Sequence, residues 1–230
     1  MKGLPIILLL FLALNLFGQN QLDEVVISND SDTTFWAQYH LLIIKKLDLI
    51  SPASHIKYLR ISSAKYFLEL TKDSAKVTFY AHEIWDSKQT GESFIKSYPL
   101  DKIQLLKIYQ LYDSLEINKI PSDKFIKKWK HGFDGITYIL ERKIETMYSF
   151  KNYWTPSIQE NFYESQRILN FTTAIDTIID YREKRKIFES EIPFYGWSFN
   201  GSMVTMRIVS NTKQYRKYKR MKRKQLKARE

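Results

Sequence analysis

The side chains best suited to acid–base chemistry are His131, Asp134 and Glu141, which lie close together in the chain. Glycoside cleavage uses two carboxyl groups about 5 to 9.5 Å apart, so Asp134 and Glu141 are candidates for such a pair, with His131 nearby. Asp134 precedes Gly135, however, and this dipeptide is typical of a turn. Glu141 is followed by two basic residues near the end of an expected strand. We therefore favour structural roles for both carboxylates and keep hydrolysis as the alternative.

Other catalytic and metal-binding motifs are incomplete or missing. The chain has four histidines, namely His40, His55, His82 and His131. None is paired at ligand spacing, and His82-Glu83 lacks the second histidine of a zinc-protease helix. No Gly-rich phosphate loop or dinucleotide fingerprint occurs. We predict neither a metal site nor a cofactor.

The segment from Gly196 to Gly201 reads Gly-Trp-Ser-Phe-Asn-Gly. It nearly matches the nucleophile elbow of serine hydrolases, but its second glycine comes one residue late. The elbow also requires a strand-to-helix turn in a parallel sheet, which this chain is not expected to contain. The favoured interpretation is a turn at Asn200-Gly201 ahead of a last strand.

Two aromatic clusters are candidates for a binding surface. Tyr153 and Trp154 precede one proline, and Tyr195 and Trp197 follow another. Aromatic rings in loops form flat platforms for sugars or protein partners, because each ring offers apolar area with few torsions to freeze. Large rings are mostly buried on average, so we favour core packing and keep ligand binding as the alternative.

Hydrophobic periodicity divides the chain into helices and strands. Helices are expected at 32–51, at 101–116 and from 155 onward, and strands at 65–71, 76–85, 93–98, 136–142, 144–151 and 203–209. Residues 54–63 fit either structure, and residues 72–75, 86–92 and 134–135 fit turns. This order, mostly with short connections, predicts an α+β fold: an antiparallel sheet with helices packed on one side. No Pro/Gly/Ser-rich linker divides residues 19–212, so a single domain is expected.

Two helix starts carry capping residues. Asp101 and Gln104 have the spacing of a capping box. Pro156 suits the first turn of a helix, and Ser157 with Glu160 repeats the capping spacing. We therefore expect the longest helix to begin at 155–157. Its expected buried residues are Ile168, Phe171, Ile175 and Ile178.

Residues 1–18 have the composition of a cleavable secretory leader. Lys2 is followed by an apolar stretch from Leu4 to Phe17 and then by Gly18, which is the order of a signal peptide. This stretch of fourteen residues is shorter than the about 20 that a membrane-spanning helix needs. We predict export with cleavage near Gln19, which leaves no integral membrane protein; a permanent anchor and a buried core helix are the alternatives. Cysteine is absent, so the exported chain has neither disulfides nor a lipidated cysteine.

The formal charge of +11 is concentrated at the C-terminus. Residues 213–230 contain ten Lys or Arg and one acid, a net of +9. Residues 1–212 contain 26 basic and 24 acidic residues, a net of +2, so the globular body is close to neutral. Lys and Arg favour helix, but like charges three and four residues apart repel. A basic tail at 213–230, helical or disordered, is therefore expected.

This basic tail is the candidate contact with an anionic surface. In an exported protein the partners would be phospholipid head groups, lipopolysaccharide phosphates or acidic polysaccharide. Nucleic acid is not expected, because the leader removes the chain from the cytoplasm. The residues expected to make the contact are Arg216, Lys217, Lys219, Arg220, Lys222, Arg223 and Lys224. A solvated end that only aids solubility is the alternative.

Two segments resemble proteins of one bacterial group. Leu16-Phe17-Gly18-Gln19 resembles the cleavage region of exported proteins of Bacteroidetes-type bacteria, where a glutamine often follows the cut. Residues 129–156 resemble segments of uncharacterised exported proteins of that group, with a Trp, an Asp-Gly turn, a strand ending in Glu, a second strand and an aromatic-Pro corner. The resemblance implies compartment and fold and brings no known activity.

Together these features favour an exported, non-catalytic binding protein of the periplasm or the extracellular space, attached to the envelope through its tail. The alternative is an envelope hydrolase or carbohydrate-binding protein. It would use the region from Asp134 to Glu141 together with Trp154 and Trp197.

Overall fold

The computed structural model describes residues 26–34, 55, 57–199, 203–206 and 212–228. The leader predicted at 1–18, most of the helix predicted at 32–51 and the turn predicted at 200–201 lie outside the described residues. The chain divides into two compact units: one spans 1–79 and 95–190, and the other spans 80–94 and 191–230. The basic segment predicted as a separate tail belongs by its contacts to the second unit.

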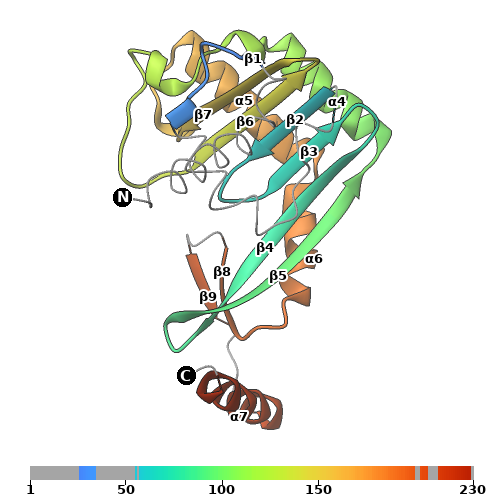
Figure 1. Cartoon of the computed structure of the whole chain (residues 1–230), viewed down its shortest axis with the longest axis vertical. Helices are drawn as coiled ribbons and strands as arrows, with labels where there is room; N and C mark the ends of the chain where they lie inside the picture. The colour runs from blue at the N-terminus through green and yellow to red at the C-terminus, as the bar shows by residue number, and fades with distance from the viewer. Residues whose placement is uncertain (1–25, 35–54, 56, 200–202, 207–211, 229–230) are drawn as a thin grey trace, which may run out of the picture. The chain divides into compact units, whose positions relative to one another are not determined.

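Within the described residues, nine strands form an open, mostly antiparallel sheet (Figure 1). The strands are β1 (Val26–Ile27), β2 (Lys57–Ser62), β3 (Phe67–Thr71), β4 (Ala75–Trp85), β5 (Lys88–Leu100), β6 (Thr137–Ile144), β7 (Met147–Trp154), β8 (Gly196–Phe199) and β9 (Met203–Met206). Their order is β1-β7-β6-β2-β3-β4-β8-β9, and β5 pairs with β4. The short β1 runs parallel to β7. The α+β fold with an antiparallel sheet is confirmed.

Three helices of this fold pack behind the sheet in Figure 1: α4 (Lys102–Ser114), α5 (Tyr163–Ile178) and α6 (Tyr181–Glu191). Aromatic rings pack between these helices and between the helices and the strands. The Tyr112 ring of α4 contacts Phe171 of α5 at 5.7 Å, and Phe79 of β4 contacts Phe188 of α6 at 5.6 Å between ring centroids. Because side chains alternate along a strand, every second strand residue joins this core. The apolar strand residues on this face include Leu59, Ile61, Leu68, Leu70 and Val77.

The capping prediction is confirmed for α4 and wrong for α5. Asp101 accepts a hydrogen bond from the Gln104 backbone N–H at 2.7 Å, and the Gln104 side chain accepts one from the Asp101 N–H. At the helix start predicted at 155–157, Thr155 has a left-handed φ of 38°, and residues 156–158 form a short 3-10 turn, η5 (Pro156–Ile158). The helix itself begins only at Tyr163. A left-handed residue at Asp180, with φ of 53°, then separates α5 from α6.

The β4–β5 hairpin is longer than predicted. A turn was expected across residues 86–92, but it consists of Asp86 and Ser87 alone, with φ of 51° and 62°. Two consecutive left-handed residues make the tight turn that matches strand twist, so β5 starts at Lys88. No strand was predicted just before the expected turn at 200–201, but residues Gly196–Phe199 form β8. Ser198 lies within β8, opposite His82 of β4 and Val204 of β9, so it is not placed on a strand-to-helix elbow.

A buried lysine ties β7 to the segment after α4. The Lys151 ammonium donates to the backbone carbonyls of Asn118 and Ile120 at 2.8 Å and lies 2.5 Å from Asp30 Oδ2. Burial lowers the pKa of Lys151, and Asp30 offsets only part of that shift. Burial alone would raise the pKa of Asp30, but the Lys151 ammonium and the Ser28 hydroxyl hold it below its ordinary value.

This arrangement predicts how the Lys151→Met variant responds to acid. The lowered pKa of Asp30 contributes stability above its unfolded pKa of about 3.9, and that stability is lost as pH falls through the folded pKa. Without Lys151, the variant should lose less stability on acidification, by at most about 1 kcal/mol because Asp30 is partly exposed. Urea unfolding at pH 6 and at pH 3 measures the difference. Lys72→Met, on an exposed turn, is the control, and an equal pH dependence in Lys151→Met and the wild type would contradict the assignment.

Candidate anion-binding site

The three acid–base candidates do not come together in the structure. Glu141 is fully buried in β6, whereas His131 and Asp134 are exposed. Glu141 accepts hydrogen bonds from Arg60 Nη1 at 2.8 Å and from the Tyr148 hydroxyl at 2.6 Å. Its carboxylate is therefore hydrogen-bonded in the interior and is not accessible to a substrate that reaches the exposed Asp134.

Glu141 belongs to a buried charge cluster across three neighbouring strands. In the ladder register, Arg60 of β2 lies opposite both Glu69 of β3 and Glu141 of β6. Its guanidinium is 3.1 Å from Glu69 Oε1 and 2.8 Å from Glu141 Oε2, and all three side chains are fully buried. The Lys76 ammonium lies 3.2 Å from Glu69 Oε2, so the four formal charges cancel. Mutual pairing of this kind is what permits charges to be buried.

His131 faces a different carboxylate, that of Asp123 in the short turn η4 (Asp123–Phe125). The distance from His131 Nδ1 to Asp123 Oδ2 is 3.8 Å. Asp123 also accepts hydrogen bonds from the Trp154 backbone N–H at 2.8 Å and from Asn152 Nδ2 at 3.0 Å. Burial raises the pKa of Asp123, although the Trp154 N–H and His131 oppose the shift. These bonds fasten η4 to the end of β7, so Asp123 holds the fold together here.

Two of the four candidate aromatic binding residues, Tyr153 and Trp197, are buried, and a third, Trp154, is partly buried. Tyr153 is fully buried, and its hydroxyl donates to the Ile120 carbonyl at 2.9 Å. Trp197, in β8, is also buried. The Trp154 ring is covered by the preceding loop so closely that a Cβ at Gly132 would lie 2.7 Å from it. The favoured expectation of core packing is therefore correct for Tyr153 and Trp197, and the alternative of an exposed platform does not hold for these two rings.

The fourth, Tyr195, lies in the second unit beside α7 (Lys213–Lys227), the helix formed by the basic segment. Its ring centroid is 5.0 Å from that of Tyr215 and 4.7 Å from that of Tyr218. Trp85, at the end of β4, meets Tyr218 edge-on at 5.8 Å. A cluster of four rings thus joins the helix to the strands of this unit.

A buried carboxylate anchors α7 to β4. Glu83 is fully buried, and its Oε2 lies 2.7 Å from the Lys222 ammonium; the Lys222 side chain is 9% exposed. Glu83 Oε1 accepts a hydrogen bond from the Tyr218 hydroxyl, and Oε2 accepts one from the Thr90 hydroxyl at 2.7 Å. A charge-assisted contact of this kind is stronger than a neutral hydrogen bond. Lys222 was predicted to face an anionic surface; that prediction is wrong, because the residue points inward to Glu83.

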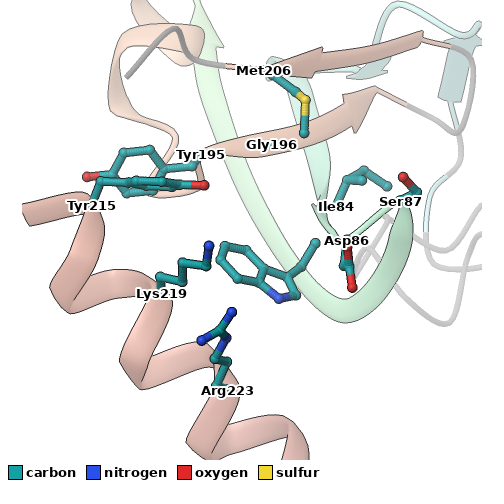
Figure 2. A pocket seen from close by; sticks show the side chains of 10 residues that line it. Ile84, Asp86, Ser87, Tyr195, Gly196, Met206, Tyr215, Lys219 and Arg223 are labelled. Carbon is teal, nitrogen blue, oxygen red and sulfur yellow. The ribbon is translucent and has the colours of Figure 1, made fainter. Parts of the chain in front are cut away.

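Next to this anchor, the second unit forms a pocket of about 440 Å³. Its walls come from the β4–β5 turn, the start of β8, the end of β9, and α7 (Figure 2). The lining residues are Ile84, Trp85, Asp86, Ser87, Tyr195, Gly196, Met206, Tyr215, Lys219 and Arg223. In Figure 2 the side chains of Lys219 and Arg223 extend from α7 toward the side of the pocket formed by Asp86 and Ser87. The pocket therefore combines positive charge with aromatic walls.

The basic residues of α7 divide between two faces. Lys219 and Arg223 line the pocket and Lys222 binds Glu83. The remaining four predicted surface residues are exposed: Arg216, Lys217, Arg220 and Lys224. With 3.6 residues per turn, those four fall within an arc of about 100° on the helix. One helix thus presents an inner face to the protein and an outer, uniformly basic face to solvent.

Several residues of this site were not identified from sequence. Glu83 was noted only as the neighbour of His82, and Trp85 is only the last residue of the strand predicted at 76–85. The usable signal was the spacing of Tyr215, Tyr218 and Lys222, which lie on one face of a helix. Within the part of the chain that the structure describes, no group of three or more His, Asp or Glu side chains is placed to hold a metal ion.

Comparison with known proteins does not assign the chain to a family. No protein-family model matches it, and no curated protein matches it in sequence. Among the described residues, no helix has the length and apolar character needed to cross a membrane.

Proposed function

We propose that this is an exported binding protein that attaches to an anionic surface of the bacterial envelope through the outer face of α7. The observation that carries the proposal is the separation of charges on that helix. Glu83 neutralises the inward Lys222, whereas Arg216, Lys217, Arg220 and Lys224 are exposed on one side. The leader pattern at 1–18 supports export and so limits the anionic surfaces that the helix meets.

The expected strength follows from the number of charges on the outer face. Each Lys or Arg close to an anionic lipid surface contributes about 1 kcal/mol, and the attraction decays within a Debye length of about 8 Å at physiological salt. The four residues together therefore favour binding by up to about a thousandfold. Because α7 is held by its inner face, these residues need not be ordered at the moment of binding, which lowers the entropic cost.

Vesicle co-sedimentation tests the attachment. The mature protein is purified after export, and its intact mass shows whether cleavage occurs near Gln19. Phosphatidylglycerol vesicles should pellet it at low salt, phosphatidylcholine vesicles should not, and about 0.5 M salt should release it. Retention of Met1 would contradict export without affecting the lipid result.

A matched pair of variants separates α7 from net charge. Changing Arg216, Lys217, Arg220 and Lys224 to Gln should reduce binding by at least about thirtyfold. The control changes four exposed basic residues of the first unit to Gln, namely Lys127, Lys128, Arg182 and Lys186. It removes the same charge and should retain most of the binding. Equal losses in both variants would show that attraction is general and would reject the helix as the attachment surface.

A further inference from the structure

The inner pocket of the second unit has the size of a small-molecule site. Its volume of about 440 Å³ lies within the usual range for ligand pockets. It is partly open to solvent and is bounded by three separate elements, α7, the β4–β5 turn and the β8–β9 pair. A ligand seated there would contact all three.

Two cations give this pocket its charge. Lys219 and Arg223 are four residues apart, so they lie on one face of α7. Within the described residues, neither forms an ion pair, unlike the neighbouring Lys222. Among the lining residues that the structure describes, Asp86 is the one acid, so their net charge is +1. A guanidinium binds carboxylate or phosphate with two parallel hydrogen bonds, and the ammonium adds a point charge beside it.

The remaining lining is flat and apolar with a few polar groups. Trp85, Tyr195 and Tyr215 supply aromatic surface, and Ser87 supplies a hydroxyl. A pyranose ring has an apolar C–H face that packs on aromatic rings, and hydroxyls that bond to polar neighbours. Inorganic anions would use the cations and leave the aromatic walls unfilled.

We infer that this pocket binds one acidic sugar unit, a pyranose that carries a carboxylate or a phosphate. The acidic group lies against Lys219 and Arg223, and the sugar ring lies against the aromatic wall that includes Trp85. This inference goes beyond the proposed attachment, because it uses the inner face of α7 and does not depend on its outer face. The two are therefore open to independent tests.

Calorimetric titration of the whole mature protein with four probes tests the ligand class. Galacturonate and glucose 6-phosphate represent the two acidic groups, glucose lacks the charge, and inorganic phosphate lacks the ring. At least one acidic sugar should bind about tenfold or more tightly than both glucose and inorganic phosphate. Which acid binds better decides between carboxylate and phosphate as the natural group. Binding of phosphate as tight as that of the sugars, or no binding of either acidic sugar, would overturn the inference.

Variants then locate the binding. Arg223→Gln should weaken binding of the acidic sugar about tenfold or more, and Arg223→Lys should restore part of it because the charge remains. Trp85→Leu should weaken the sugars and leave phosphate unchanged. Arg220→Gln, on the outer face of the same helix, is the matched control and should bind as the wild type does. Equal effects of Arg220→Gln and Arg223→Gln would place the ligand elsewhere, and far-UV circular dichroism checks that each variant is folded. The titration of the unaltered protein stands if a variant does not fold.

Discussion

An Arg60→Leu variant is expected to lose about 3–5 kcal/mol of unfolding free energy. The guanidinium is the cation between Glu69 and Glu141, and all three side chains are fully buried. Removing it takes the shared cation away from two carboxylates in the interior of the sheet, where desolvation is costly. The ion pair of Glu69 with Lys76 remains, but Lys76 is partly exposed. A loss of this size is a large fraction of the stability of a typical domain.

Urea unfolding monitored by circular dichroism measures the effect. Arg182→Leu, which removes an exposed arginine from α6, is the control and should change stability by less than about 0.5 kcal/mol. A triple variant with leucine at Arg60, Glu69 and Glu141 should be more stable than Arg60→Leu, because the two buried carboxylates are removed together with their cation. If Arg60→Leu unfolds at the same urea concentration as Arg182→Leu, the ion pairs of Arg60 with Glu69 and Glu141 do not stabilise this sheet.

The second large effect is expected at Glu83, whose replacement by leucine should release α7 from β4. The Lys222 ammonium would lose its partner in a largely buried position, and the Tyr218 hydroxyl would lose its acceptor. Breaking a buried pair by removing one partner costs about 3–5 kcal/mol. Here the cost falls on the docking of one helix, so local opening should precede global unfolding.

Limited trypsin digestion reports that opening, because α7 is rich in cleavage sites and cleavage follows the population of the open state. Glu83→Leu should be cut within α7 at least about tenfold faster than the wild type, and Lys222→Leu should behave similarly. The double variant should be cut more slowly than the two single effects predict, because neither charge is then left alone. Glu183→Leu, an exposed site on α6, is the control. Unchanged cleavage in Glu83→Leu would refute the anchor.

The released helix also separates the two proposed activities. It keeps its outer basic residues, so Glu83→Leu should still bind anionic vesicles. The pocket, in contrast, needs Lys219 and Arg223 beside Trp85, so acidic-sugar binding should be lost. Loss of vesicle binding together with sugar binding would mean that attachment needs the docked helix.

Short-range sequence patterns predicted the structure correctly where the residues of the pattern bond to one another in the fold. Asp101 and Gln104 lie three residues apart and cap α4 with reciprocal hydrogen bonds, so the helix start was predictable from spacing. The same signal failed at Ser157. There the Gln159 side chain donates to the Trp154 carbonyl at 3.2 Å and accepts a hydrogen bond from the Lys130 backbone N–H at 2.8 Å. A contact with a residue 29 positions away thus keeps this segment out of the helix.

The fold class, the start of α4 and the concentration of positive charge near the C-terminus were predictable from the chain, because alternation, capping and composition are local properties. The roles of the charged residues depend on long-range contacts instead. Arg60 meets Glu141 across 81 positions of sequence, and Glu83 meets Tyr218 across 135. Spacing along the chain does not encode contacts of such range, since they depend on which strands become neighbours. That pairing placed Glu141 in the interior and divided the basic residues of α7 between a pocket and an outer surface.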